Sequence, residues 1–263
     1  MRRTRITAVS YLNTKPLLYG LVRSELYDSI DLSLDIPSEG ARKLIAGEVD
    51  LGLVPVAVIP EIPDARVISD YCIGAVGAVK TVGIYSRVPI EEVTRLHLDF
   101  HSRTSIQLAQ VLLREYWHAA PKLVPATPDF LQHIGPTEAA VVIGDRTIGL
   151  ETQFPYFYDL SEHWQHHTGL PFVFAAWVAR GELPEGFEDR FNRALHAGVQ
   201  TIDELQYLLP SPHPDFSLTE YFTRYISYDL SEEKRRALCL FLEKIEVENA
   251  RASSSPAPEP ISL

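Results

Sequence analysis

Short apolar runs alternate with amphipathic runs along the first part of the chain. The β-type runs are Ile6–Ser10, Leu32–Ile36 and Leu51–Val54, and the helix-type runs between them are Pro16–Val22 and Ser38–Ala46. Apolar strands that alternate with amphipathic helices are typical of βαβ units, so the pattern predicts an α/β protein with a mainly parallel sheet. Ser38 is placed to cap the second helix, and Gly47 is placed to end it.

A second series of strand and helix patterns follows and indicates a second lobe. Its expected elements are the strands His97–Phe100, Lys122–Val124 and Ala139–Gly144 and the helix Thr104–Trp117. Two further strands, Thr81–Ser86 and Phe172–Ala179, are expected to carry the chain out of the first lobe and back. Three helical patterns come later in the chain, near Phe187–Leu209, Leu218–Ile226 and Ser231–Val247.

This order of elements predicts two lobes joined by two hinge strands, with a ligand cleft between them. Residues 1–86 and 175–250 are assigned to the first lobe, and residues 87–174 to the second. Residues 251–263 are rich in Ser and Pro, and this composition predicts a disordered tail.

The composition is that of an ordinary globular protein and narrows the choice of partners. The chain has 263 residues, of which 46% are hydrophobic and 22% are charged. Its formal net charge of -11 opposes broad binding to nucleic acid, which relies on many Lys and Arg contacts with phosphate. An anionic ligand would therefore have to meet local hydrogen-bond donors. The composition leaves the oligomeric state open.

The cysteine content and the N-terminus indicate a cytoplasmic protein. Cys72 and Cys239 lie far apart in the sequence and form neither a CxxC motif nor a metal-type spacing. The first residues lack the apolar core of a signal peptide, and no window is long and apolar enough to span a membrane. We therefore expect a reducing compartment and no membrane partner.

Four polar segments follow predicted strands, at the positions where parallel α/β sheets bind ligands. They are Ser10–Thr14, Asp50–Ala57, His101–Ser105 and Gly144–Arg146. Each also has a purely structural explanation, because Ser, Thr, Asn and Asp are common helix caps and proline is common at the first helical position. Local sequence favours that explanation for the first, second and fourth segments. It leaves both explanations open for the third, which places two hydroxyls and free backbone amides at a helix start.

The motifs that would indicate a cofactor or a metal are missing from the chain. It contains no GxGxxG, no GxxxxGK[ST], no HExxH and no GxSxG. His163, His166 and His167 could share one face of a helix, but no complete metal ligand set accompanies them, and a solvent-exposed face is the expected role. We expect neither a cofactor nor a metal.

Six segments, taken in order, resemble the menaquinone-biosynthesis chorismate dehydratases of the futalosine pathway. They are SYLNTKP at 10–16, GEVDLGLVPVA at 47–57, YSRVP at 85–89, SRTS at 102–105, VIGDRT at 142–147 and YDLSEHW with TGLPFVFAAW at 158–177. Their order and spacing match over about the first 180 residues. His101 departs from the family pattern, in which Ser is common, and could alter the fit of the substrate or the response to pH.

The resemblance implies the two-lobed, type II fold of periplasmic binding proteins, used inside the cell as an enzyme. It implies a hydro-lyase that converts chorismate, a dianion, to 3-[(1-carboxyvinyl)oxy]benzoate. Two alternatives stay open. One is a non-catalytic protein that binds a small organic acid in the same cleft, and the other is the sister dihydroxynaphthoate synthase of the same pathway.

Under this hypothesis nine residues have predicted roles at the cleft. Asn13 orients the reacting part of the substrate, and Asp145 is one candidate for the general base. The side-chain carboxylate of the substrate is the other candidate, which we favour because it needs only correct orientation. Thr104 and Ser105, with Ser86, are predicted to hold a substrate carboxylate through neutral hydrogen bonds. The remaining predicted substrate contacts are Ser10, Tyr11, Pro55 and Gly144.

Overall fold

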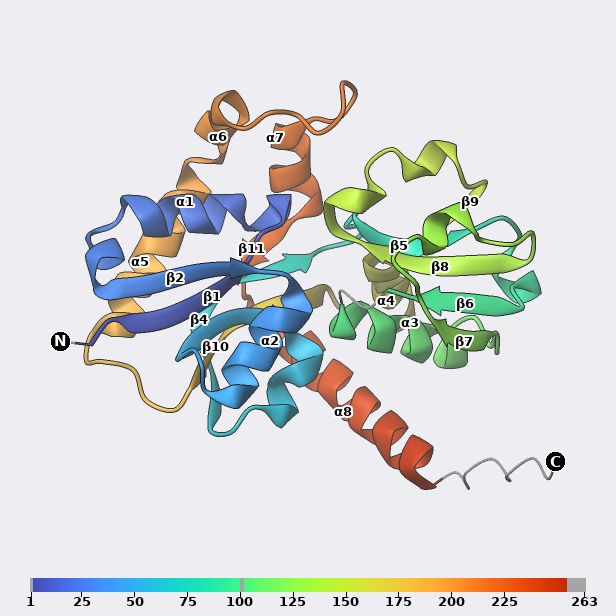
Figure 1. The fold of residues 1–263 in the computed structure, drawn as a ribbon, viewed down its shortest axis with the longest axis horizontal. Helices are drawn as coiled ribbons and strands as arrows, with labels where there is room; N and C mark the ends of the chain where they lie inside the picture. The colour runs from blue at the N-terminus through green and yellow to red at the C-terminus, as the bar shows by residue number, and fades with distance from the viewer. Residues whose placement is uncertain (1, 100–101, 255–263) are drawn as a thin grey trace.

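The computed structural model describes residues 2–99 and 102–254 of the chain. These residues form two β-sheets, one in each lobe, and helices cover both sheets (Figure 1). The first sheet contains the N-terminal strands, and the second is built from strands in the middle of the chain. The predicted two-lobed α/β fold is therefore confirmed. His101 and residues 255–263 lie outside the described residues.

The first sheet has the strand order β11-β4-β10-β3-β1-β2. Its strands are β1 (Thr4–Val9), β2 (Ile30–Asp35), β3 (Leu51–Pro55), β4 (Ala65–Ala75), β10 (Phe172–Arg180) and β11 (Ser227–Asp229). β1 pairs in parallel with β2 and β3, whereas β10 is antiparallel to β3 and β4, and β11 is antiparallel to β4. The prediction of a mainly parallel sheet is wrong, because β10 returns from the second lobe and runs in the opposite direction.

The second sheet has the order β7-β6-β8-β5-β9 and is also mixed. Its strands are β5 (Val82–Ser86), β6 (Arg95–Leu98), β7 (Lys122–Pro125), β8 (Glu138–Ile143) and β9 (Tyr156–Asp159). β5 lies wholly in this sheet and β10 wholly in the first, so neither acts as a strand shared by both lobes. The boundaries expected after residues 86 and 174 are therefore misplaced. The chain crosses between the sheets at residues 76–81 and 169–171.

Most helices belong to one lobe or the other, and the long C-terminal helix contacts both. The first lobe carries α1 (Lys15–Arg23), α2 (Pro37–Ala46), α5 (Phe187–Gln200), α6 (Ile202–Leu208) and α7 (Leu218–Glu220), and the second carries α3 (Arg103–Glu115) and α4 (Leu160–Thr168). Shorter turns of helix are the 3-10 segments η1 (Leu12–Thr14), η3 (Val56–Glu61) and η6 (Gly144–Thr147) and the π-helical η8 (Tyr221–Tyr225). The long α8 (Glu232–Ser254) includes residues 251–254, which were expected to be disordered.

The two ends of α2 give different results for the predicted caps. The helix begins at Pro37 and no side chain caps it, so the prediction for Ser38 is wrong. Proline is suited to the first helical position because its missing N–H would have no partner within the helix. Gly47 ends the helix with a φ of 73°, a left-handed conformation that glycine adopts readily, and this prediction is confirmed.

A close contact between α1 and α5 sets the position of α1, the helix that follows the Ser10–Thr14 segment. A Cβ added to Gly20 would lie 2.0 Å from the carbonyl oxygen of Ala194 and 2.7 Å from the amide nitrogen of Gly198. Only glycines allow the two backbones to approach this closely. Helix α1 is thereby fixed against α5.

Asp159 holds the first crossing segment against the second lobe. One carboxylate oxygen accepts the N–H groups of Val79 and Lys80 at 2.9 and 2.7 Å, and the other caps α4 through Ser161 and Glu162. Burial raises the pKa of Asp159 to about 6, although the backbone N–H groups favour the charged form. One carboxylate therefore joins the crossing to the start of α4.

In the view of Figure 1, helix α8 starts between the lobes and runs out below them. Phe241, fully buried, packs against Trp164 of α4 and Phe172 of β10, with ring centroids 6.0 and 5.1 Å away. Lys244 forms an ion pair with Glu115 at the end of α3. Aromatic packing and an ion pair thus tie α8 to strands and helices of both lobes.

Glu115 gives this attachment a pH dependence. Burial would raise the pKa of Glu115, but hydrogen bonds from Arg114, Lys244 and His167 outweigh it and lower the pKa to about 2. A carboxyl group whose pKa is lower in the folded state stabilises the fold above its unfolded pKa, near 4.5, and this contribution is lost as the pH falls toward 2.

Glu115→Gln should therefore lower the melting temperature at pH 7, and its difference from the wild type should shrink as the pH is lowered from about 4.5 toward 2. Thermal unfolding followed by circular dichroism between pH 7 and 3 measures both effects. The control is Glu185→Gln, since Glu185 is exposed. A difference from the wild type that stays constant across this range would contradict the assigned role.

Candidate functional site

A pocket lies where the carboxyl ends of β1 and β3 face the end of β8 and the start of α3. Hydroxyl and amide groups make up its polar lining, and none of the lining residues carries a formal charge. The polar lining residues are Tyr11, Asn13, Thr14, Ser102 and Ser105. The others are Val9, Pro37, Pro55, Ile73, Val79, Val82, Ile143, Gly144, Phe174 and Ala175. Both lobes therefore contribute to one neutral site.

Residues 11–14 cross the mouth of this pocket and contact the second lobe. Both carboxylate oxygens of Asp145 lie 3.1 Å from the amide nitrogen of Leu12 and accept its hydrogen. The ring of Tyr11 covers Gly144, where an added Cβ would lie 3.0 Å from the ring. Asp145 therefore caps the start of η1, which belongs to the other lobe and lies 133 residues earlier in the chain.

Helix α3 supplies the opposite wall through its first turn. Ser102 caps the helix, because its hydroxyl oxygen accepts the N–H of Ser105 at 3.1 Å. The hydroxyl of Thr104 is buried and accepts the N–H of Ala57, from η3 of the first lobe, at 3.2 Å. The positive end of the helix dipole and the free N–H groups of its first turn thus face the pocket.

Charged groups lie around the pocket, outside its lining. Asp99, fully buried at the end of β6, forms an ion pair with Arg146 of η6. Burial raises the pKa of Tyr11 to about 12. The positive charge of Arg146 acts to lower this pKa, and the negative charges of Asp99 and Asp145 act to raise it. Partial burial also raises the pKa of Asp145, although the N–H of Leu12 opposes the shift. Tyr11 is therefore a neutral hydrogen-bonding group at physiological pH.

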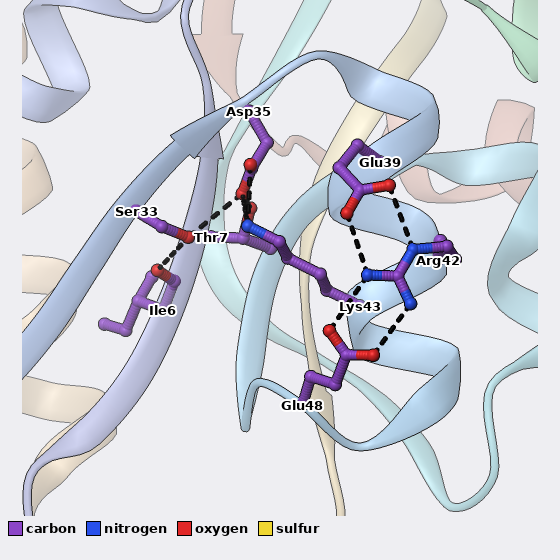
Figure 2. A network of polar contacts seen from close by, with 8 residues as sticks. All are labelled: Ile6, Thr7, Ser33, Asp35, Glu39, Arg42, Lys43 and Glu48. Carbon is purple, nitrogen blue, oxygen red and sulfur yellow. Dashed lines mark hydrogen bonds and ion pairs between the residues drawn. The ribbon is translucent and has the colours of Figure 1, made fainter.

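Asp35, at the end of β2, supports the pocket from behind. Its carboxylate accepts hydrogen bonds from Thr7 at 2.7 Å, from Ser33 at 3.0 Å and from Lys43 of α2 at 2.7 and 2.8 Å (Figure 2). Burial would raise the pKa of Asp35, but these hydrogen bonds outweigh it and the pKa is lowered. The network ties α2 to the sheet and so fixes Pro37, the first residue of α2, in the pocket wall.

The structure brings five of the nine predicted residues together in the lining: Tyr11, Asn13, Pro55, Ser105 and Gly144. Thr104 lies directly behind the lining, and Asp145 lies at its rim. Ser10 is exposed, and its N–H is bonded to the carbonyl oxygen of Asp35.

The predicted role of Ser86 does not agree with its position. β5 runs antiparallel to β8, so its first residue, Val82, lies beside the pocket and Ser86 ends at the far edge of the sheet. There the Ser86 hydroxyl donates to the carbonyl of Val88 at 2.7 Å. The sequence could not show this, because the direction of a strand depends on pairing with distant segments.

Several lining residues were missed by reasoning from sequence. Ser102 belongs to a predicted segment but was left out of the predicted contacts. Pro37 begins a predicted helix, and Phe174 lies inside a predicted strand, yet neither residue type signals a ligand. Apolar wall residues resemble core residues in sequence, because the same side chains serve both purposes.

Each of the three histidines of α4 has a structural contact, and His166 packs against His163 with ring centroids 5.9 Å apart. The Nδ1 of His163 lies 2.8 Å from the carbonyl oxygen of Asp159, and its ring packs on Trp117. Burial lowers the pKa of His163. His167 lies 3.3 Å from Glu115. Among residues 2–99 and 102–254, no group of three or more His, Cys, Asp or Glu side chains is arranged to hold a metal ion.

The volume of the pocket limits what it can hold in this conformation. About 50 Å³ is available inside it, well below the roughly 300–1,000 Å³ typical of small-molecule pockets. A larger ligand requires the lobes to separate, which would break contacts such as Leu12 to Asp145, Ala57 to Thr104 and the 2.7 Å ion pair between Arg103 and Glu61.

Comparison with solved structures identifies the class of fold. Protein AF1704 from Archaeoglobus fulgidus superposes with a TM-score of 0.75 at 14% identity, covering 94% of this chain and 98% of that one. A Candida albicans protein described as having the generic periplasmic binding protein fold gives 0.62 at 11% identity, over 97% of this chain and 92% of that one. At these identities the likeness shows the fold alone: two lobes, as in periplasmic binding proteins.

The sequence comparison identifies the family. The chain belongs to the menaquinone biosynthesis family, whose sequence model matches residues 4–247. A relative from Thermus thermophilus, named chorismate dehydratase, is 27% identical over 233 residues, which cover 80% of this chain and 84% of that protein. The part of the chain that the family model matches, residues 4–247, includes every lining residue of the pocket. Within the described residues, no helix is both long and apolar enough to cross a membrane.

Gly144 allows a direct test of the pocket geometry. Its φ is +69°, so Gly144→Ala should lose about 1–2 kcal/mol to backbone strain and more to the collision with the Tyr11 ring. Gly149→Ala is the matched control, because Gly149 has a φ of +88° with nothing within 4 Å of an added Cβ. Urea denaturation should show a larger loss of stability for Gly144→Ala. Equal losses would show that Tyr11 does not cover this position.

Proposed function

We propose that this protein converts chorismate to 3-[(1-carboxyvinyl)oxy]benzoate and water, as a carbon–oxygen hydro-lyase of menaquinone biosynthesis. The observation that carries the proposal is the relative named chorismate dehydratase, which this chain matches over 84% of its length. The neutral pocket between the lobes supports it. We place the protein in the cytoplasm, with chorismate as a dianion and no cofactor, since the reaction changes no net oxidation state.

The reaction removes a proton from C3 of the ring and a hydroxide from C4, which together make one water molecule. The electron pair of the C3–H bond forms the new ring double bond, and the ring becomes aromatic. Charge that develops at C3 can delocalise onto the C1 carboxylate through the ring double bond. An enzyme accelerates such a step by placing hydrogen-bond donors where charge grows.

The start of α3 suits the C1 carboxylate of chorismate. Ser105 lines the pocket, and the free N–H groups of the first turn and the helix dipole favour an anion there. Neutral donors hold a carboxylate without the desolvation cost of a buried, fixed cation. Asn13, from the opposite lobe, is our candidate for orienting the enolpyruvyl group or the departing hydroxyl.

The position of Asp145 favours the substrate as its own base. Both oxygens of Asp145 accept the N–H of Leu12, so the carboxylate is engaged in holding η1. The enolpyruvyl group of chorismate is attached to C3 through its ether oxygen. Its carboxylate can therefore lie close to the C3 proton that must leave. Correct orientation of a reacting group that is already attached can contribute several kcal/mol, on the order of 7–11 in the best cases.

The non-catalytic binding protein and the dihydroxynaphthoate synthase are the competing functions, and one assay separates the three. Purified protein incubated with chorismate should produce a new aromatic ultraviolet spectrum, with a product that lacks one water by mass spectrometry. A binding protein would bind chorismate without a change in mass. Folded protein that neither binds nor converts chorismate would rule out our proposal and favour the synthase.

Two substitutions test the assigned roles. Asn13→Ala should lower kcat roughly 100- to 1,000-fold, the range for loss of one preorganised donor. Asp145→Asn should keep most of the turnover, because an amide oxygen can still accept the N–H of Leu12. Steady-state kinetics with chorismate measure both. Loss of turnover in Asp145→Asn with unchanged chorismate binding would instead identify Asp145 as the base.

A further inference from the structure

A second hollow lies on the first lobe, where helices α1 and α5 pack against each other (Figure 1). Residues within the range 19–26 and residues on the face of α5 between Arg190 and Thr201 line it, and we call it the α1–α5 hollow. Its volume is about 420 Å³, within the range of roughly 300–1,000 Å³ that small-molecule sites have. It shares no lining residue with the pocket between the lobes, so it is a separate place on the molecule.

The lining of the α1–α5 hollow is cationic, although the protein is acidic. Arg23 from α1 and Arg190 and Arg193 from α5 line it against one acidic lining residue, Glu25, so the lining has a formal charge of +2. The whole chain has a formal charge of -11, and the pocket between the lobes is lined by neutral residues. Like charges that are gathered in one place repel one another, and an anion between them removes this cost. The charge of the lining therefore favours an anionic ligand.

Carboxylates of the protein do not neutralise these three arginines. Among residues 2–99 and 102–254, no Asp or Glu oxygen lies within 4.0 Å of a side-chain nitrogen of Arg23, Arg190 or Arg193. Glu188, in the same helix as two of them, forms an ion pair with Arg66 instead, at 2.9 Å. The positive charge of the α1–α5 hollow is thus left for a ligand.

Most of the N–H donors on these arginines also remain available. Arg23 donates one N–H to the hydroxyl of Tyr19 at 2.5 Å, and its guanidinium carbon lies 5.1 Å from the centroid of that ring. The Nε of Arg190 donates to the carbonyl of Gly186 at 3.3 Å. Within the described part of the chain, Arg193 donates no hydrogen bond. Each guanidinium has five N–H donors, so all three arginines keep donors for a ligand.

These donors suit a phosphate group better than a carboxylate. A carboxylate has two coplanar oxygens that match the fork of one guanidinium. A phosphate ester has three terminal oxygens that do not lie in one plane with the phosphorus, so it can accept from several guanidiniums at once. Carbon surface for the organic part of such an ester is supplied by the ring of Tyr19 and the side chains of Leu26 and Ala194.

We propose that the α1–α5 hollow is a second binding site, for a small organic molecule that carries a phosphate ester. Arg23, Arg190 and Arg193 hold the phosphate, and the ring of Tyr19 contacts the organic part. This inference does not rest on the function proposed for the pocket between the lobes, because binding in the α1–α5 hollow is measured without chorismate.

Isothermal titration calorimetry with three probes tests the class of ligand. Phenyl phosphate should bind at one site per chain and at least about tenfold more tightly than benzoate, which carries a carboxylate on the same ring. Inorganic phosphate should bind more weakly than phenyl phosphate, because it has no ring to contact Tyr19. The affinity for phenyl phosphate should fall as sodium chloride is added, since the three arginines are exposed.

Each probe can contradict a part of the proposal. If phenyl phosphate does not bind, there is no such site. Benzoate with the same affinity as phenyl phosphate would overturn the assignment to phosphate, and inorganic phosphate with the same affinity would overturn the contact with the organic part.

Substitutions locate the site on the molecule. Arg190→Gln and Arg193→Gln should each raise the Kd for phenyl phosphate roughly 5- to 20-fold, because each removes a charged hydrogen-bond donor. Both residues are exposed, so the fold should be retained, and circular dichroism checks this. Arg236→Gln is the matched control, because it removes the same charge from an exposed residue of α8 and should leave the Kd unchanged. An equal loss in the control would show a general attraction to positive charge and overturn the site.

Glu25→Gln should have the opposite effect. It removes the negative charge from the lining of the α1–α5 hollow and should lower the Kd for phenyl phosphate roughly two- to fivefold. A gain in affinity cannot come from partial unfolding. An unchanged or higher Kd would place the bound phosphate away from Glu25 and contradict the proposal.

Chorismate turnover distinguishes this proposal from the proposed function. Arg193→Gln should convert chorismate as the wild type does, because Arg193 does not line the pocket between the lobes. Phenyl phosphate that binds to a wild type without dehydratase activity would support the α1–α5 hollow and refute the proposed function. Loss of both phenyl phosphate binding and chorismate turnover in folded Arg193→Gln would show that the two ligands share one site, and it would overturn a separate one.

Discussion

The site depends on satisfying the backbone of one short segment, Leu12–Thr14, where it lies between the lobes. A buried N–H or C=O without a partner costs about 1–3 kcal/mol, so such a segment needs fixed partners. Asp145 of the second lobe takes the N–H of Leu12, and Tyr228 of β11 donates to the carbonyl of Asn13. The same bonds that satisfy this backbone also set where the Asn13 side chain lies.

The neutral lining of the pocket is consistent with a protein of net charge -11 that is proposed to bind an anion. Fixed cations are kept outside the lining, and Arg146 is paired with the buried Asp99. Hydroxyls, an amide and the N-terminal turn of α3 remain to meet the ligand. These groups are preorganised by Ser102, which caps α3, and by Asp35, which ties α2 to β1. The charge of the ligand would therefore be stabilised by neutral hydrogen-bond donors next to it, and not by the net charge of the protein.

Some contacts between the lobes lie at the pocket, and others lie away from it. Asp145, Thr104 and Arg103 contact the first lobe at the pocket, and these bonds would break if the lobes separated. Asp159 holds the crossing segment, and helix α8 packs on aromatic residues of both lobes through Phe241. These two sets of contacts together hold the lobes in the arrangement described.

The sequence by itself determined the alternation of elements, the two lobes and the end of α2 at Gly47, because these depend on local periodicity and on the residues that end helices. It also indicated five of the lining residues, but only through the resemblance to a family, because local patterns favoured helix capping for most of those segments. Tertiary structure decided the rest. The direction of β5, which removes Ser86 from the pocket, depends on pairing with β8, and the hydrogen bond from Tyr228 to the backbone carbonyl of Asn13 joins residues 215 positions apart. A polar side chain shows in sequence that it needs a partner, but only the packed chain determines which partner it finds.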